Sequence, residues 1–199
     1  MIREKNIIIQ EKPDWVSWDD IKQCLYEAHA PNREKGINMT HYLWPAEKIK
    51  ESLGEHGVML VALDGKKLVG TAAIAEKNGN SWYANEKYAY LCYASVLLAY
   101  KGHGIYRSLT DRREIYARKR GYNILLFDTH YHNFRVQDIA KKNGYVLVRF
   151  FRPKSGDHYS VVMAKWLNGC PYSVFYCRKQ YYLSKVKTIL RTKFRLSWQ

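Results

Sequence analysis

Apolar runs and segments with helical periodicity alternate along the chain, and turn residues separate them. Runs rich in β-branched and aromatic residues predict strands, whereas apolar residues three or four positions apart predict helices. The longest apolar run, 88–100, predicts a central strand, and Asp64–Gly65 between two apolar runs predicts a hairpin. Strands are expected at 6–10, as two runs within 58–80, and at 88–100, 123–130, 145–152 and 158–166; helices are expected at 17–30, 46–57, 104–121 and 133–144.

This order of elements predicts an α/β fold. Strands that alternate with helices favour a single mixed, central twisted sheet with helices on both faces. In the segment 104–121, Ile105, Leu109, Ile115 and Tyr116 have helical spacing, and Gly121 marks the end of the helix. We expect residues 1–167 to form the domain and residues 168–199 to form a basic C-terminal tail that is partly helical.

Composition narrows the class of protein. The chain has 199 residues, of which 47% are hydrophobic, and this suits one domain with a substantial core. No run of 18 apolar residues occurs, so no membrane span is expected. The first residues lack the small-residue cleavage site of a secretory signal, and we expect a cytoplasmic protein. The four cysteines form no CxxC pair, which predicts free thiols and no bound metal.

The formal net charge of +15 is unevenly distributed. No acidic residue follows Asp157, and the tail alone carries a charge of +7. Such a chain favours polyanions, anionic membrane surfaces or acidic ligands, although no feature predicts a specific nucleic acid. One interpretation of the tail is a helix that lies on an anionic membrane. The alternative is a helix that packs on its own domain or on a second subunit, which would make a homodimer. Apolar residues recur near one face of this helix, namely Leu183, Val186, Leu190 and Phe194.

A strand, a glycine-rich turn and a helix follow one another in "SVLLAYKGHGIYRSL", residues 95–109. Backbone amides at the start of a helix bind phosphate, and glycines allow the backbone to approach it closely. The turn is not a Walker A loop, because no Gly-Lys-Ser/Thr follows. It is not a dinucleotide fingerprint either, because Arg107 occupies the position of the third glycine. From spacing alone, an ordinary glycine turn remains the alternative.

The residues around this turn resemble the GNAT-type N-acetyltransferases. The motif of that family is Arg or Gln, two residues, Gly, one residue, then Gly or Ala. Gly104 matches the central glycine, Lys101 replaces the usual Arg or Gln, and Tyr106 departs from the small final residue. A second block matches downstream, where Asn133 begins a helix that ends at Gly144–Tyr145. The resemblance spans about residues 18–166.

The resemblance implies that the chain binds acetyl-CoA as acyl donor. The turn would hold the diphosphate through its amides, and His103 would contribute its amide while its ring faces solvent. The end of the preceding strand would bond the pantetheine and polarise the thioester carbonyl. The residues that the resemblance places at the donor are Ser95, Val96, Leu97, Lys101, Gly102, His103, Gly104, Ile105, Tyr106, Arg107 and Asn133.

The resemblance also implies positions for proton transfer. Many members of the family have a tyrosine acid seven residues after the motif Asn, and here that position is Ala140. Some members have a carboxylate base five residues before the motif Asn, and here that position is Asp128. Asp128 is therefore the candidate base, with capping or pairing to an arginine as its alternative. Tyr131 and His132 are further catalytic candidates, each with an ordinary loop position as the alternative.

The acceptor is expected near the first two helices and their link. There Arg33 and Glu34 are candidates for contacts with charged groups, and Met39 and Tyr42 for packing on a flat or apolar acceptor. The expected reaction is acetyl transfer to a primary amine, of a small molecule or a peptide, by direct attack in a ternary complex. Two alternatives stay open. One is a longer acyl or aminoacyl donor; the other is a non-catalytic basic module that binds polyanions or membranes and has a degenerate CoA site.

Overall fold

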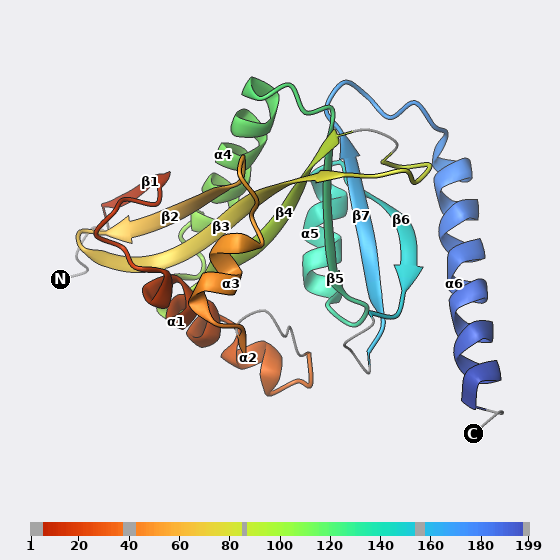
Figure 1. Cartoon of the computed structure of the whole chain (residues 1–199), viewed down its shortest axis with the longest axis horizontal. Helices are drawn as coiled ribbons and strands as arrows, with labels where there is room; N and C mark the ends of the chain where they lie inside the picture. Colours follow the sequence, from red (N-terminus) through yellow and green to blue (C-terminus); the bar gives the residue numbers. More distant parts are fainter. Residues whose placement is uncertain (1–5, 38–42, 85–86, 154–157, 197–199) are drawn as a thin grey trace.

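A seven-stranded mixed sheet in the order β1-β2-β3-β4-β5-β7-β6 forms the centre of the molecule (Figure 1). The computed structural model describes residues 6–37, 43–84, 87–153 and 158–196. β4 and β5 are parallel, and every other neighbouring pair is antiparallel. The strands are β1 Ile7–Glu11, β2 Val58–Asp64, β3 Lys67–Asn78, β4 Lys87–Val96, β5 Ile124–His130, β6 Val146–Phe151 and β7 Ser160–Trp166.

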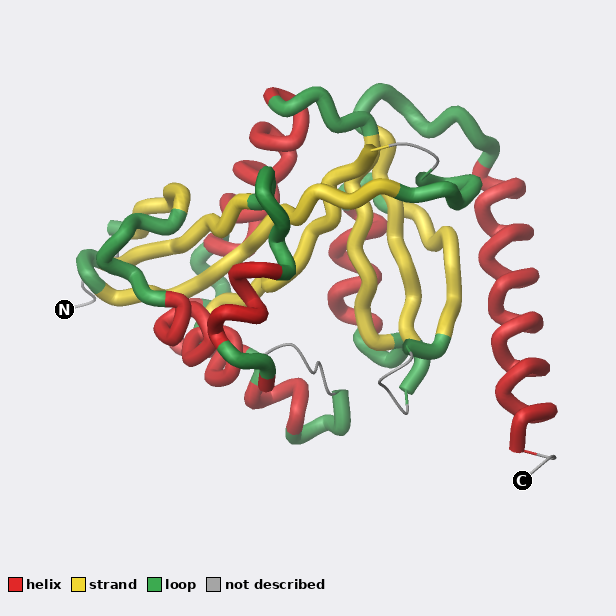
Figure 2. Tube along the Cα trace, in the orientation of Figure 1, coloured by secondary structure: helices red, strands yellow, loops and turns green. Residues whose placement is uncertain are grey.

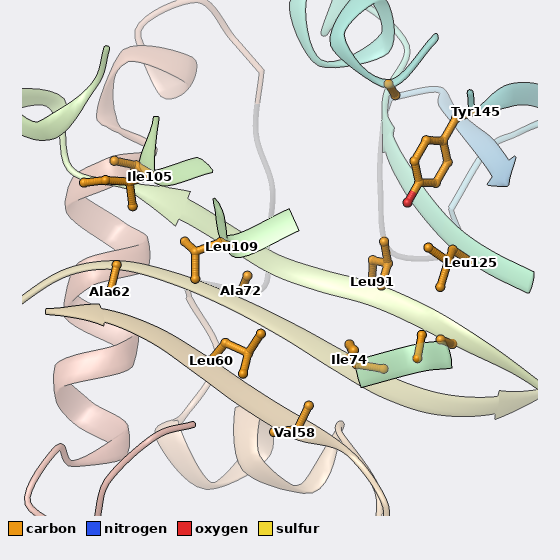
Figure 3. Close-up of a cluster of buried hydrophobic side chains, with 14 of the residues drawn as sticks. Val58, Leu60, Ala62, Ala72, Ile74, Leu91, Ile105, Leu109, Leu125 and Tyr145 are labelled. Atoms are coloured by element: carbon orange, nitrogen blue, oxygen red, sulfur yellow. The ribbon is translucent and has the colours of Figure 1, made fainter. Parts of the chain in front are cut away.

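Helices cover both faces of this sheet, because successive residues of a strand point to opposite faces. Leu60 of β2 packs in the same cluster as Leu109 of α4, and Figure 3 shows this cluster. Its neighbour Val61 packs on the other face with Ile21 of α1 and Ile49 of α3. The predicted α/β fold is therefore confirmed. The helices are α1 Trp18–Ala28, α2 Ala30–Arg33, α3 Ala46–Glu51, α4 Ile105–Lys119, α5 Phe134–Lys142 and α6 Val174–Leu196, with a 3₁₀ turn at Leu98–Tyr100.

The sheet divides where β4 meets β5. In the described chain these two strands pair at Ala89–Leu125 and Tyr90–Leu126, although β4 continues to Val96. Figure 2 shows that the strands of the β5–β7 half run in a different direction from those of the β1–β4 half. The β5-facing edge of β4 beyond Tyr90 therefore has no neighbouring strand in the described structure.

A β-bulge lies in this unpaired part of β4. Thr71 of β3 pairs with Ser95, but Ala73 pairs with Cys92, so two residues of β4 face one residue of β3. Tyr93 has a φ of 53°, which is uncommon for a residue with a side chain. Bulges bend a strand and redirect its groups, and they are frequent beside active sites.

The helix expected over 104–121 forms as α4, and its buried face includes an arginine. Its buried residues are Ile105, Leu109, Arg113 and Ala117, each four positions after the last. Ile115 lies on the opposite side of the helix and is 47% exposed. An arginine occupies the third position of the buried row, and the apolar Ile115 does not belong to that row.

The tail contains α6, which lies along the edge strand β6 (Figure 1). The Ser184 hydroxyl accepts a hydrogen bond of 2.9 Å from the Phe150 amide, and the Thr188 hydroxyl donates one of 3.1 Å to the Phe150 carbonyl. Cys177 and Tyr181 are buried on the same side of α6. The helix thus covers a sheet edge that would otherwise expose unpaired backbone groups. None of the helices in the described part of the chain combines the length and hydropathy of a membrane span.

The two positions on α4 allow a direct test of the buried row. Leu109→Ala should lower the free energy of unfolding by about 2–5 kcal/mol, because Leu109 is buried against the sheet and its loss leaves a cavity. Ile115→Ala, the matched control on the exposed side, should change it by less than about 0.5 kcal/mol. Urea unfolding measures both values. Equal losses would contradict the described orientation of α4.

Candidate active site

Two adjoining cavities lie where β4 and β5 diverge. We call the first the outer cavity; it has a volume of about 400 Å³ and is lined by the end of β4, the 101–107 turn and the start of α5. The inner cavity, of about 170 Å³, is lined by the middle of β4, the second half of β5, α4 and α5. His29, Ala94 and Asn133 line both. An elongated ligand could therefore extend from one cavity into the other.

The glycine turn exposes backbone amides to the outer cavity. Gly104 is the N-cap of α4 with a φ of 72°, and Gly102 has a φ of 86°. Both values lie in the left-handed region that glycine adopts without strain. The first amides of α4 are therefore presented to the cavity without a side-chain cap from Gly104, and the helix dipole favours an anion there.

Cations surround this turn. Lys101, Arg107 and Arg135 all line the outer cavity. Burial, followed by repulsion from Arg135 and Lys35, lowers the pKa of Lys101. Concentrated positive charge beside open helix amides is the environment that a phosphate or diphosphate requires. This site fits the diphosphate of a CoA thioester.

Most of the donor residues expected from the sequence line the outer cavity, with two exceptions. The Leu97 amide donates a 2.9 Å hydrogen bond to the Val69 carbonyl, so it is committed to the sheet and is not free for a ligand. His103 is exposed, and its Nδ1 lies 3.1 Å from the Lys101 carbonyl oxygen. The residues that do line the cavity are Ser95, Val96, Lys101, Gly102, Gly104, Ile105, Tyr106, Arg107 and Asn133.

Two buried hydroxyl groups hold the bulge of β4. Thr71 Oγ1 donates a 2.7 Å hydrogen bond to the Tyr93 carbonyl and also lies 2.7 Å from Ser95 Oγ. Both residues are almost fully buried. This bonding fixes the backbone of Ala94, which lines both cavities at their junction. The bulge is therefore a rigid feature at the point where the two cavities meet.

His29 lies at the same junction, and the sequence reasoning did not select it. Its Nδ1 lies 3.2 Å from the amide nitrogen of Asn32. Burial and the positive charges of Lys101 and Arg33 lower the pKa of His29 to about 4. A hydrogen bond with the Ala94 backbone raises this pKa, but by less. The imidazole is therefore neutral at physiological pH. Its position four residues after buried Leu25 was the available signal, because that spacing puts it on the inner face of α1.

Asp128 and Tyr90 form a pair in the inner cavity. The Tyr90 hydroxyl donates a hydrogen bond to Asp128 Oδ1. Burial raises the pKa of Asp128, while the hydrogen bond from Tyr90 and the nearby His158 act in the opposite direction. Burial and the Asp128 charge hold the pKa of Tyr90 well above its ordinary value. Tyr90 thus keeps its proton, and the partly buried Asp128 is an acceptor with raised basicity.

The other two catalytic candidates lie elsewhere. Tyr131 packs against Phe150, and its hydroxyl accepts a 3.0 Å hydrogen bond from Lys185 of α6. His132 is exposed, and its backbone amide donates to His130 Nδ1. Neither belongs to the described lining of either cavity. The structure therefore does not bring these two candidates to the Asp128–Tyr90 pair, because the chain turns after β5 and carries their side chains toward β6 and solvent.

The acceptor candidates are only partly placed. Arg33 folds back on α1, where Nη1 donates a 2.6 Å hydrogen bond to the Tyr26 carbonyl and the guanidinium stacks 3.9 Å from the Tyr26 ring centroid. Glu34 is exposed, and neither side chain is in the described lining of the cavities. Met39 and Tyr42 lie outside the described residues. From this region the structure instead brings Asn32 to the cavities.

Thiol and metal chemistry receive no support at this site. Cys92 lines the inner cavity, but burial raises its pKa to about 12, so it stays protonated. All four cysteines are free thiols. The described residues contain no cluster of three or more His, Cys, Asp or Glu side chains that could hold a metal ion.

Comparison with known proteins agrees with this geometry. The sequence profile of the Acetyltransferase (GNAT) family matches residues 16–145. No curated protein sequence matches the chain. Among solved structures, the ribosomal-protein-S18-alanine N-acetyltransferase from Escherichia coli is similar, with a TM-score of 0.61 and 15% identity over 84% of this chain and 97% of that one.

Two further structures share the fold. Aminoglycoside 6'-acetyltransferase type Ii has a TM-score of 0.61 and 21% identity, covering 82% of this chain and 99% of that one. A chain of the NatC complex bound to Gag peptide and CoA has a TM-score of 0.63 and 13% identity, covering 81% and 98%. Identities this low establish the fold alone, but the family profile covers more than half of the sequence. The chain belongs to the GNAT acetyltransferase family.

Proposed function

We propose that this protein transfers an acetyl group from acetyl-CoA to a primary amine, by direct attack in a ternary complex. The observation that carries the proposal is that the two cavities adjoin at the β4 bulge, where they share lining residues. A site suited to a diphosphate lies at one end, and the Asp128–Tyr90 pair lies at the other. We place this reaction in the cytoplasm.

The 101–107 turn and its cations would bind the diphosphate, and the pantetheine arm would run along the unpaired edge of β4. The thioester then comes to lie at the bulge. Backbone amides of this edge near Ala94 would stabilise the negative charge that develops on the thioester oxygen. Their position is fixed by the Thr71 hydrogen bonds, and this rigidity is what such stabilisation requires.

Asp128 would remove the proton of the attacking amine, either directly or through Tyr90 or a water molecule. A raised pKa brings a carboxylate closer to the ideal for a general base. The new bond joins the amine nitrogen to the acyl carbon, the carbon–sulfur bond breaks, and the sulfur leaves as a thiolate. Ala140 offers no acid at the position of the family tyrosine, so we assign protonation of the thiolate to solvent.

The competing function is a non-catalytic basic module with a degenerate CoA site. Ala140 favours it, because the family acid is missing. The Asp128–Tyr90 pair opposes it, because burying a carboxylate is unfavourable and a binding module has no use for it. Turnover of acetyl-CoA with a panel of primary amines separates the two.

One prediction concerns donor binding. Gly104→Val should remove the rise in melting temperature that acetyl-CoA causes, because a β-branched residue at a φ of 72° distorts the amides of the turn. Gly121→Val is the matched control, since Gly121 follows the other end of α4 with a φ of 74°. It should be destabilised similarly but keep the shift. Thermal unfolding with and without acetyl-CoA measures both, and a shift retained in Gly104→Val would contradict the diphosphate site.

Another prediction concerns the base. Asp128→Asn should lower turnover by roughly 10²–10⁴ with little change in acetyl-CoA affinity. Tyr90→Phe should also slow turnover, whereas Tyr131→Phe, the matched control outside the cavities, should not. Thiol release in the presence of an accepted amine measures the rates. Near-normal turnover in Asp128→Asn would overturn the assignment.

The same variant has a stability signature. Because the folded-state pKa of Asp128 is raised, its contribution to the free energy of unfolding is greatest below its ordinary pKa. That contribution falls as the pH rises through the raised value. Asp128→Asn cannot ionise, so it should be more stable than the wild type at neutral pH and less dependent on pH. Urea unfolding from pH 4 to pH 8 tests this.

We also propose that α6 attaches the enzyme to anionic membrane surfaces. Its outer side exposes large apolar side chains at helical spacing, of which Phe175 is 77% exposed. The helix carries seven lysines and arginines and no acid, so its charge complements an anionic surface. Repulsion between two such helices disfavours a second copy as the partner. The exposed apolar residues are Phe175, Tyr182, Leu183, Val186 and Leu190.

A pair of variants tests this attachment. The double variant Leu183→Ser, Val186→Ser should bind vesicles of phosphatidylcholine with phosphatidylserine at least about tenfold more weakly than the wild type, because apolar burial is lost. Ile115→Ser, an exposed isoleucine on α4, is the control and should bind like the wild type. Vesicle sedimentation measures this. Absence of wild-type binding, or a change from dimer to monomer in the variant, would favour a protein partner instead.

A further inference from the structure

An arginine occupies a core position in α4. Arg113 belongs to the row of residues that α4 turns toward the sheet, and it is 4% exposed. Its neighbours in that row, Leu109 and Ala117, belong to the main hydrophobic cluster. Among the described Lys, Arg, Asp and Glu residues, Arg113 is the one that is almost fully buried, whereas Asp128 is partly buried. Arginine stays charged in proteins, so its burial requires a partner.

That partner is missing from the described protein. Arg113 Nη2 donates a 3.3 Å hydrogen bond to Thr110 Oγ1, while Nε is buried without an acceptor. Glu114, the next residue, directs its carboxylate to Lys165 at 2.6 Å and to Arg118 at 2.9 Å. No carboxylate of the described residues lies within 4.0 Å of the Arg113 guanidinium.

Tyr145 also has a buried polar group that lacks a partner. Its hydroxyl is buried without a hydrogen-bond partner in the described structure. Figure 3 shows the ring reaching into the cluster with its hydroxyl directed toward Leu91. Burial raises the pKa of Tyr145, and the Arg113 charge partly opposes this rise. The two groups are therefore close enough to interact. Both line the inner cavity, where a charged donor and a phenol donor together suit a carboxylate.

The position of this pair relative to the bulge identifies the ligand. Phe127 of β5 packs against the main hydrophobic cluster, which contains Leu109 of α4, whereas Leu126 packs on the opposite face of the sheet. Residues two positions apart in a strand point to the same face, so Asp128 lies on the same face as Leu126 and faces away from Arg113. An amine that gives its proton to Asp128 approaches from one face of the sheet. The far end of an acyl chain attached at the bulge can extend toward the other face, where Arg113 and Tyr145 lie.

We propose that the preferred donor is a short acyl-CoA whose acyl chain ends in a carboxylate, and that Arg113 and Tyr145 bind this carboxylate. The inference rests on the proposed acyl transfer and specifies its donor. The inner cavity, of about 170 Å³, is larger than a methyl group requires. Ala140, in place of a tyrosine, contributes to this space. The transfer itself is unchanged: the bond from sulfur to the acyl carbon breaks, and the carboxylate at the other end takes no part.

A matched pair of thioesters tests the proposal without knowledge of the amine. Succinyl-CoA and butyryl-CoA have equal chain lengths and differ in a terminal carboxylate against a methyl group. Titration calorimetry with the wild-type protein should show succinyl-CoA binding about 10- to 100-fold more tightly, as expected for charge-assisted hydrogen bonds. Butyryl-CoA binding as tightly as succinyl-CoA would overturn the proposal, as would a cavity that holds only water in the bound structure.

Arg113→Met keeps most of the side-chain length and removes the charge. The ratio of the two affinities should fall toward one in this variant, and its melting temperature should not decrease, because an unpaired buried charge is removed. Tyr145→Phe should lower the ratio to a smaller extent, and it keeps the test valid if Arg113→Met fails to fold. An unchanged ratio in both variants would contradict the assignment of these residues.

Binding of acetyl-CoA distinguishes a failure of the donor proposal from a failure of the proposed acyl transfer. If acetyl-CoA and butyryl-CoA bind but succinyl-CoA does not, the donor proposal is wrong and acyl transfer stands. If none of the three thioesters binds, acyl transfer itself is contradicted, and the donor proposal fails with it.

Discussion

The divergence of two parallel strands determines the rest of this molecule. β4 and β5 pair through two residue positions in the described chain and then separate, which leaves one edge of β4 without a strand partner. Unpaired backbone groups in a protein interior are unfavourable unless something satisfies them. The bulge, the glycine turn and both cavities all lie along this edge. A ligand with a long polar arm, such as pantetheine, supplies the missing hydrogen bonds.

The proton-transfer groups depend on the same divergence. Tyr90 is the last residue of β4 paired with β5, and Asp128 lies two residues beyond its partner Leu126. Strand alternation puts Tyr90 and Asp128 on one face of the sheet, just where the strands begin to separate. They are close enough to share a hydrogen bond, and the cavity between the strands is open to them. The acyl group and the base therefore meet at a position that the sheet itself defines.

Local features of this site were readable from the sequence, and non-local ones were not. Gly104 and Asn133 belong to short motifs whose geometry depends on their immediate neighbours, and the structure places both at the cavities. Asp128 was found through a fixed distance from Asn133. Tyr90 and His29 were missed, because their roles depend on contacts with segments far away in the sequence. Tyr131 and His132 lie outside the described lining of both cavities, since nearness in sequence to Asp128 does not fix where a loop turns.

The strongest direct test of the account is a crystal structure of the protein with CoA. The account predicts the diphosphate on the amides of residues 104–107 and the pantetheine along β4, with the sulfur at the bulge beside Ala94 and within reach of the inner cavity. CoA bound at another surface, or with its sulfur remote from Asp128, would contradict the central claim that the divergence of β4 and β5 builds the active site.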